Sequence, residues 1–589
     1  MVILPQPRKQ EILGGKVVFE SEYSYIPLNP EYESVTKYIG SFLKCAENAE
    51  RKIIFKVDEG LGKEEYILEI DEDIAITSLS AEGAFRAATT LKQLVREKET
   101  EKQIIHDYPM IKNRGIMLDI SRGKIPKTES LFRLIDMLSD LKYNELQLYM
   151  ESLVFEYEHF PEYWKDNMPI TKQELIEIKK YCSERFITLV PNQNGFGHMG
   201  KWLEKEELTH LGITREGGGD TTTLNPFKKE SIELVDTIYG DLLPYFDADF
   251  VNVGMDEPFE LGMGETKEIC EKEGQGKVYV EYLNKILKLA NEKYNKTPMF
   301  WDDIVFNHPE YIKDVNPDSI VMDWGYEQEF PFMERCRFIK ENGLKFYTCP
   351  GTSTWASFTG RFENMIYNIE AAAKACIAHD GEGFLLTDWG DGGHPHFIVM
   401  SFLPFIYGAC CSWNYKVSRE LTPISHAPLC KMEGGITDFC IDYADKLLFN
   451  GSKVGRILRK AANYYLLENN SIWNVTNIWM DTGNIINGKA VKLDAVTCRQ
   501  IVDYMNSIKE ELYGVDKNTP YYDEIICNCD MVILSARFIA ASVGNEKDSG
   551  LKEELEELKI RFVELWKREN REVGFRTYMG RVDKMIECL

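Results

Sequence analysis

Two adjacent carboxylates, Asp256 and Glu257, follow a short apolar run near the middle of the 589-residue chain. Residues 250–253 (Phe-Val-Asn-Val) predict a buried strand, and Gly254 and Pro258 predict that the chain turns directly after it. Side chains alternate along a strand, so both acids can face one site only if the strand ends before them. Paired carboxylates at such a strand end can perform general acid–base chemistry. From this stretch alone, a helix cap at Asp256 with a solvated Glu257 is the alternative.

The expected positions of the two acids depend on an alternation of predicted strands and helices that begins near residue 109. Eight apolar strand-like segments alternate with amphipathic helical segments, which predicts an α/β fold, the (β/α)8 TIM barrel, with its active site at the carboxyl ends of the strands. A doubly wound open sheet is the competitor, but no glycine-rich phosphate turn follows the first strand. The predicted strands are 114–119, 145–150, 186–191, 249–254, 298–301, 319–323, 344–348 and 383–388.

Two further domains are expected around the barrel. Residues 1–108 alternate strand and helix patterns, with a probable hairpin at 66–77, and predict a small α+β domain. Residues 426–589 carry helical periodicity without a strand pattern and predict a helical C-terminal domain, which could serve packing or a homodimer. The barrel then occupies residues 109–425.

Tryptophans follow the later barrel strands together with carboxylates. Trp301, Trp324, Trp355 and Trp389 stand at or just after strand ends, and Asp391 follows the last of them. An indole ring can stack on the apolar face of a sugar while carboxylates accept hydrogen bonds from its hydroxyls. Any one tryptophan could simply pack the barrel rim, but four at equivalent positions favour a carbohydrate site.

Composition excludes several classes of partner. The net charge of −26 opposes polyanions, so no nucleic acid and no anionic membrane surface is expected as a partner. No window approaches 18 uncharged apolar residues, so no membrane span is expected. The N-terminal residues lack the pattern of a signal peptide, and the 14 cysteines are scattered without a C-x-x-C pair. Buried free thiols in a reducing, cytoplasmic compartment are therefore expected.

Metal chemistry is the rival to carbohydrate chemistry. Asp388, His394 and His396 resemble a ligand cluster, but no H-E-x-x-H motif or similar histidine pair supports a catalytic zinc. We therefore expect the two histidines to form hydrogen bonds within a loop, and we expect neither a metal nor an organic cofactor.

Several motifs resemble those of glycoside hydrolase family 20, the β-N-acetylhexosaminidases. Residues 114–122 (RGIMLDISR) are similar to the family's R-G-x-x-L-D-x-x-R opening strand, and residues 196–198 (FGH) to its Pro-Gly-His turn. Residues 252–257 (NVGMDE) are similar to its (His/Asn)-x-G-x-D-E strand. The tryptophans described above resemble its later strand ends. The resemblance covers the barrel, and a small α+β domain before it is usual in the family.

The resemblance implies a retaining mechanism in which the substrate assists. The 2-acetamido oxygen of the sugar would attack its own anomeric carbon and form an oxazolinium ion. Glu257 would be the general acid and then the general base. Asp256 would hold the acetamido N–H and stabilise the developing positive charge. We therefore expect an exo-acting enzyme that removes terminal β-linked GlcNAc or GalNAc from glycans or glycoconjugates.

The resemblance also assigns substrate-binding roles. Arg114 would bind O3 and O4 of the non-reducing sugar, and Asp391 would bind O4 or O6. Trp389 would form the floor of the pocket. Trp301 and Trp324 would form its wall around the acetamido methyl group.

Other assignments are less complete. His198 would support the acidic pair, although a core histidine is the alternative. Tyr326 and Tyr347 are candidates to hold the acetamido carbonyl, with Trp355 near the expected region. The family's His-x-His-x-x-Asp stretch after strand two is absent, because residues 150–155 read MESLVF. A glycosidase of another sugar and a non-catalytic glycan-binding barrel are the alternatives.

Overall fold

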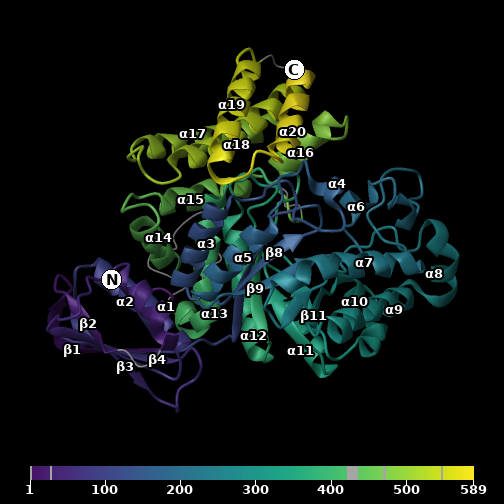
Figure 1. Cartoon of the computed structure of the whole chain (residues 1–589). Coiled ribbons are helices and arrows are strands. Elements are labelled where there is room, and N and C mark those ends of the chain that lie inside the picture. The colour runs from purple at the N-terminus through teal and green to yellow at the C-terminus, as the bar shows by residue number, and fades with distance from the viewer. Residues whose placement is uncertain (1–2, 27–29, 421–435, 469–472, 545–547) are drawn as a thin grey trace.

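The computed structural model describes residues 3–26, 30–420, 436–468, 473–544 and 548–589. A small sheet domain, a closed barrel and a helical domain follow one another along the chain (Figure 1). The predicted boundary at residue 108 falls between the last strand of the sheet and the first strand of the barrel. The predicted boundary at residue 425 lies outside the described residues.

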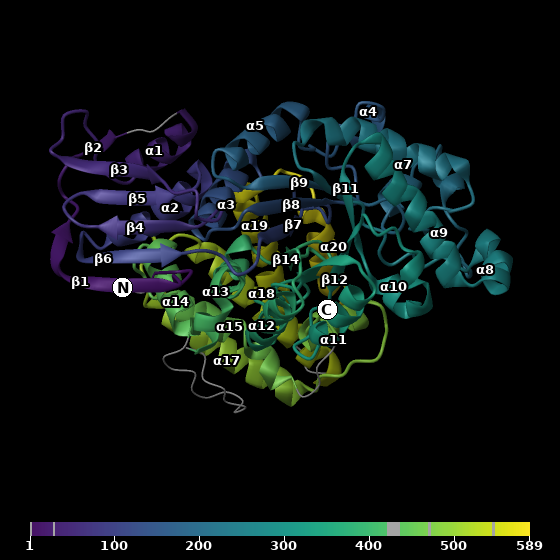
Figure 2. The same cartoon turned by 90° about the horizontal axis from the view of Figure 1, so that it is seen from below.

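The N-terminal domain is one six-stranded sheet in the order β1-β6-β4-β5-β3-β2, which Figure 2 shows side by side. The predicted hairpin is present as the antiparallel pair β4 and β5. Helix α2 packs on this sheet and is buried along most of its length. The elements are β1 (Lys9–Val18), β2 (Tyr23–Ile26), α1 (Glu33–Gly40), β3 (Arg51–Val57), β4 (Tyr66–Ile70), β5 (Ile74–Ser78), α2 (Ala81–Arg96) and β6 (Glu99–Asp107).

The barrel closes through eight parallel strands, and β14 pairs in register with β7. The TIM barrel expected from the sequence is confirmed. Its strands are almost wholly buried, which explains their continuous apolar sequences. The strands are β7 (Asn113–Asp119), β8 (Glu145–Met150), β9 (Thr188–Gln193), β10 (Phe250–Asn252), β11 (Thr297–Trp301), β12 (Ile320–Trp324), β13 (Lys345–Cys349) and β14 (Gly383–Asp388).

Helices cover the outside of the barrel, as the alternation in the sequence requires (Figure 1). The segment between β11 and β12 is short. The helices are α3 (Thr128–Asp140), α4 (Pro161–Trp164), α5 (Lys172–Ser183), α6 (Gly200–Leu203), α7 (Lys229–Leu242), α8 (Lys267–Glu273), α9 (Gln275–Lys288), α10 (Asp303–Asn307), α11 (Phe332–Glu341), α12 (Phe362–Ala378) and α13 (Phe402–Glu420).

The C-terminal part is helical, as predicted, and packs on the barrel (Figure 1). Its core helix α18 is the one described helix long and apolar enough to cross a membrane, and 72% of its most apolar window is buried within the protein. The helices are α14 (Ile436–Leu447), α15 (Gly455–Ala461), α16 (Asn477–Ile486), α17 (Ala495–Tyr513), α18 (Tyr522–Gly544), α19 (Leu551–Glu569) and α20 (Phe575–Cys588).

Candidate active site

The turn after β10 brings both carboxylates to the carboxyl end of the barrel. Gly254, Met255 and Glu257 have φ values of 71°, 82° and 46°, all in the left-handed region. A Cβ on Gly254 would lie 1.6 Å from the Asn194 side-chain oxygen, so glycine alone fits there. The strand therefore ends before Asp256, and the helix-cap alternative is wrong, because no helix begins at this residue.

His198 links the two acids. Its Nε2 lies 3.3 Å from an oxygen of Asp256 and 3.3 Å from an oxygen of Glu257, while its Nδ1 lies 3.4 Å from Glu151. Gly197 permits this contact, since a Cβ there would lie 2.1 Å from the main-chain oxygen of Asp256. Burial disfavours the imidazolium, but the carboxylates outweigh burial and raise the pKa of His198 well above its usual value. The ring is therefore a cation at neutral pH.

Arg122 connects the first strand to the last. Its guanidinium lies 2.7 Å from Asp119, 3.3 Å from Glu151 and 3.1 Å from Asp391. The guanidinium carbon also lies 5.0 Å from the ring centroid of Trp389. Because Asp391 is about half exposed, its carboxylate can bind a ligand while Arg122 holds it in place.

Aromatic side chains surround these charges. Trp389 packs against Trp301, with ring centroids 6.0 Å apart, and donates its indole N–H to the Tyr326 hydroxyl at 2.7 Å. Tyr326 in turn contacts Trp324 and Trp355, at 5.2 and 5.0 Å between centroids. The indole nitrogens of Trp301 and Trp324 are buried without a hydrogen-bond partner. These rings and the charged groups above form one set, which we call the acid–aromatic cluster.

Asp303 forms a hydrogen bond with the turn that carries Asp256 and Glu257. Its Oδ2 accepts a hydrogen bond from the main-chain N–H of Glu257 at 3.1 Å. Burial, followed by the charge of Asp256, raises the pKa of Asp303 to about 8. At neutral pH this carboxyl group is therefore largely protonated.

Arg114 lies away from this cluster, and the expectation that it binds substrate is wrong. It stands near the amino end of β7, where it is 1% exposed. Its guanidinium makes hydrogen bonds of 2.6 and 2.9 Å to Glu64 of the N-terminal domain and stacks on Trp413. Glu64 also binds Arg86, so Arg114 belongs to the junction between two domains.

All the remaining predicted residues except Tyr347 come together. Glu151, Arg122 and Asp303 complete the cluster, although sequence reasoning gave them no role. Arg122 is the second arginine of the 114–122 motif. Its position after the end of the strand could have indicated that it belongs to the active site. Tyr347 lies elsewhere, since its hydroxyl donates to Glu145 inside the barrel. The predicted residues that meet are Asp256, Glu257, His198, Trp301, Trp324, Tyr326, Trp355, Trp389 and Asp391.

The histidines of the loop after β14 are buried. His394 and His396 are 2% and 0% exposed, and Nε2 of His396 forms a hydrogen bond of 3.3 Å with the Thr354 hydroxyl. Together with Asp388 they form the one group of three potential metal ligands found among the described residues.

Comparison with known families gives two matches. Residues 112–359 match the model described as glycosyl hydrolase family 20, catalytic domain. Residues 1–108 match the model described as glycosyl hydrolase family 20, domain 2. Together these two matches cover most of the sheet domain and the barrel.

Curated relatives are distant. The chain is 25% identical over 309 residues to the β-hexosaminidase subunit alpha of Bos taurus, which covers 48% of this chain and 57% of the relative. It is 28% identical over 202 residues to hexosaminidase D of Bos taurus, covering 33% of this chain and 57% of the relative. The matches thus span about half the length of these relatives.

Solved structures share the fold. A chitobiase of Flavobacterium johnsoniae superposes with a TM-score of 0.60 at 17% identity, over 99% of this chain and 98% of that one. A β-N-acetylhexosaminidase of Bacteroides fragilis superposes with a TM-score of 0.58 at 18% identity, over 70% of this chain and 90% of that one. The first likeness includes the helical domain.

Proposed function

The chain belongs to glycoside hydrolase family 20, and on that premise we propose that it is an exo-acting β-N-acetylhexosaminidase that removes terminal β-linked GlcNAc or GalNAc. Both curated relatives and the Bacteroides fragilis protein above carry hexosaminidase names, which supports the reaction class. The chemistry rests on the acid–aromatic cluster.

One observation carries the proposal: Oδ1 of Asp256 is buried and has no hydrogen-bond partner, while Oδ2 faces the His198 cation. A buried carboxylate oxygen without a donor is costly, and a ligand that supplies an N–H removes that cost. The 2-acetamido group of a HexNAc sugar supplies such an N–H. Asp256 would then orient the acetamido oxygen toward the anomeric carbon.

Glu257 supplies the proton. As the acetamido oxygen bonds to C1, the bond from C1 to the leaving oxygen breaks, and protonated Glu257 gives its proton to that oxygen. The product of this step is an oxazolinium ion, whose positive charge Asp256 stabilises. Glu257, now a carboxylate, takes a proton from water, which adds to C1 and restores the acetamido group. The configuration at C1 is retained because it is inverted twice.

The two-carboxylate route to retention is the alternative. There the nucleophile and the acid flank the scissile bond, about 5–5.5 Å apart. Here each acid lies 3.3 Å from the same histidine nitrogen, a spacing that both routes allow, so the thiazoline experiment below separates them. Arg122 and Asp391 supply charged partners for ring hydroxyls, and Trp389 and Trp301 supply flat surfaces for the sugar ring.

The test compares aryl β-GlcNAc, β-GalNAc and β-glucoside as substrates, with a thiazoline analogue of the oxazolinium ion as inhibitor. We expect turnover of at least one HexNAc substrate, no turnover of the glucoside, and inhibition by the thiazoline. Turnover of the glucoside would establish a glycosidase of another sugar. Binding of GlcNAc without any turnover would establish a glycan-binding barrel. Turnover without thiazoline inhibition would remove the substrate-assisted mechanism.

A further inference from the structure

The loop that follows β14 carries a buried group of potential ligands behind the acid–aromatic cluster. Asp388 ends the strand, and His394 and His396 follow within eight residues. One ligand atom from each lies within 4.8 Å of the others, and the two imidazole centroids are 4.6 Å apart. None of the three side chains is more than 2% exposed.

Each of the three residues has one polar atom that the fold leaves unsatisfied. Oδ2 of Asp388, Nδ1 of His394 and Nδ1 of His396 are buried and lack any hydrogen-bond partner. Buried polar atoms nearly always have a partner, so three unsatisfied atoms on three neighbouring side chains point to a missing ligand. A cation bound among these side chains would satisfy them.

We propose that Asp388, His394 and His396 bind one divalent transition-metal ion, with zinc as the first candidate. Two imidazoles and one carboxylate are a ligand set that zinc and its neighbours accept. In a tetrahedral site the ligand atoms lie roughly 3.4 Å apart. The three ligand atoms lie within 4.8 Å of one another here, a spacing that such a site allows. The ion takes no part in the proposed sugar chemistry.

Hydroxyl groups support the carboxylate as they would support a metal ligand. Thr352, Thr354 and Ser401 donate hydrogen bonds of 2.7, 2.9 and 2.8 Å to Oδ1 of Asp388. They fix the carboxylate and leave Oδ2 for the ion. Such supporting contacts orient metal ligands and strengthen binding.

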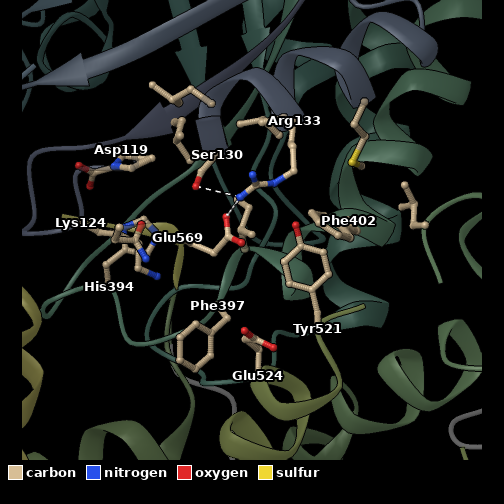
Figure 3. A pocket seen from close by; sticks show the side chains of 18 of the residues that line it. Asp119, Lys124, Ser130, Arg133, His394, Phe397, Phe402, Tyr521, Glu524 and Glu569 are labelled. Atoms are coloured by element: carbon tan, nitrogen blue, oxygen red, sulfur yellow. Dashed lines mark hydrogen bonds and ion pairs between the residues drawn. The ribbon is translucent and has the colours of Figure 1, made fainter. Parts of the chain in front are cut away.

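A cavity of about 210 Å³ reaches His394, the one member of the group that lines it (Figure 3). His394, Lys124 and Asp119 lie along one side of it, and Tyr521 and Glu524 lie on the other. Its lining is mainly apolar. The cavity has room for water, which could reach the ion and supply a fourth ligand.

Lys124 opposes the ion. Its ammonium donates a hydrogen bond to the main-chain oxygen of His396 and lies 5.1 Å from the ring centroid of Trp566. To admit a metal, this side chain must release its proton or turn into the cavity that it lines. Lys124→Met, which keeps the apolar length of the side chain, should therefore tighten metal binding about tenfold.

The site would stabilise the loop that carries Trp389 and Asp391. Both residues lie between Asp388 and His394 in the chain. An ion that joins the two ends of this segment restricts the loop and so fixes the floor of the acid–aromatic cluster.

The experiment uses the purified full-length chain. The protein is stripped with a chelator, dialysed against zinc and analysed for bound metal. We expect one zinc per chain and a higher melting temperature with zinc than without it. Cobalt should replace zinc and give visible d–d bands without a thiolate-to-cobalt charge-transfer band, because no cysteine is among the ligands.

Substitutions of single histidines test which side chains bind the zinc ion. His394→Gln and His396→Gln should each weaken zinc binding by about 100-fold or more. His198→Gln should keep the zinc, which tests the rival group of His198 with its three carboxylates. His210→Gln, at the surface, is the matched control. If the stripped chain takes up no zinc, if both loop variants keep it, or if His198→Gln loses it, the proposed site is wrong. A variant that fails to fold leaves the wild-type stoichiometry and cobalt spectrum to decide.

Discussion

The main-chain N–H of Glu257 donates a hydrogen bond to Oδ2 of the Asp303 carboxyl group, 3.1 Å away, and this bond fastens the proposed acid to the start of α10. Glu257 has a φ of 46°, a conformation that non-glycine residues seldom adopt. The hydrogen bond offsets part of the cost of that conformation. Asp303 is thus a positioning residue for Glu257.

Asp303→Ala should lower kcat about tenfold, because one hydrogen bond of about 1–1.5 kcal/mol no longer holds Glu257 in place. Asp303→Asn should retain most of the activity, since the amide oxygen can still accept the N–H. Asp318→Asn, the same change at an exposed position, is the control. Equal activity of the alanine variant and the wild type would remove the positioning role.

The pKa of Asp303 gives a separate prediction for stability. An unfolded aspartic acid titrates near pH 3.9, whereas burial and the charge of Asp256 raise the pKa of Asp303 to about 8. Between these values the folded chain holds more protons at this residue than the unfolded chain, so its stability falls as pH rises. Asp303→Asn removes this dependence. The melting temperature of the wild type, measured against that of Asp303→Asn, should therefore fall steadily from about pH 4 to about pH 8; a constant difference contradicts the shift.

Glu257→Gln and Asp256→Asn separate the two proposed roles. Glu257→Gln should lower kcat by about 10²–10⁴-fold on natural leaving groups and less on an activated aryl group, which needs little protonation. Asp256→Asn should lower kcat by about 10²–10³-fold for both and weaken thiazoline inhibition, because the oxazolinium charge loses its partner. Glu268→Gln, at the surface, is the control. An inactive Glu257→Gln beside a fully active Asp256→Asn would contradict acetamido assistance.

Substitution of Arg122 should affect catalysis, whereas substitution of Arg114 should affect stability. Arg122→Met should lower kcat/KM about 10- to 100-fold, because the contacts that hold Asp391 and any sugar hydroxyl are charge-assisted. Arg114→Met should leave KM unchanged and lower the melting temperature, because it breaks a buried ion pair with Glu64, which typically costs about 3–5 kcal/mol. The checks are steady-state kinetics and thermal unfolding on both variants. A raised KM in Arg114→Met alone would reverse the assignment.

These two arginines also show what the sequence could and could not predict. Both arginines belong to one motif, but they lie at opposite ends of β7. A strand rises about 3.3 Å per residue, so the two ends lie at opposite ends of the barrel. Whether an arginine of this motif lies before or after the strand therefore decides if it can reach the active site. The motif alone does not show this. The paired acids were placed correctly because Gly254 marks the end of their strand.

The fold was predictable where burial leaves a continuous apolar signal. All eight barrel strands are of this kind. The N-terminal sheet has strands without this signal: six of the nine residues of β6 are partly or fully exposed, and β2 has only four residues. The buried state of His394 and His396 could not be predicted, since the helical domain and the loops that cover them lie far away in sequence.

The helical domain reaches the site through Trp479 on α16. A Cβ on Gly392 would lie 2.3 Å from the Trp479 ring, and Gly392 follows Asp391 directly. The Arg581 guanidinium stacks on this indole, 3.9 Å from its ring centroid, and holds it in place. The helical domain thus packs against the loop that carries Asp391, the ion-pair partner of Arg122.

Trp479→Ala should therefore raise KM about 5- to 10-fold, because the loop gains freedom that substrate binding must remove. It should also lower the melting temperature, since truncation of a buried aromatic side chain costs about 3–5 kcal/mol. Tyr513→Ala, an exposed aromatic change in the same domain, should alter neither quantity. Steady-state kinetics below the melting temperature of Trp479→Ala separate the two effects. If that variant melts earlier but binds substrate as the wild type does, the helical domain stabilises the barrel without positioning Asp391.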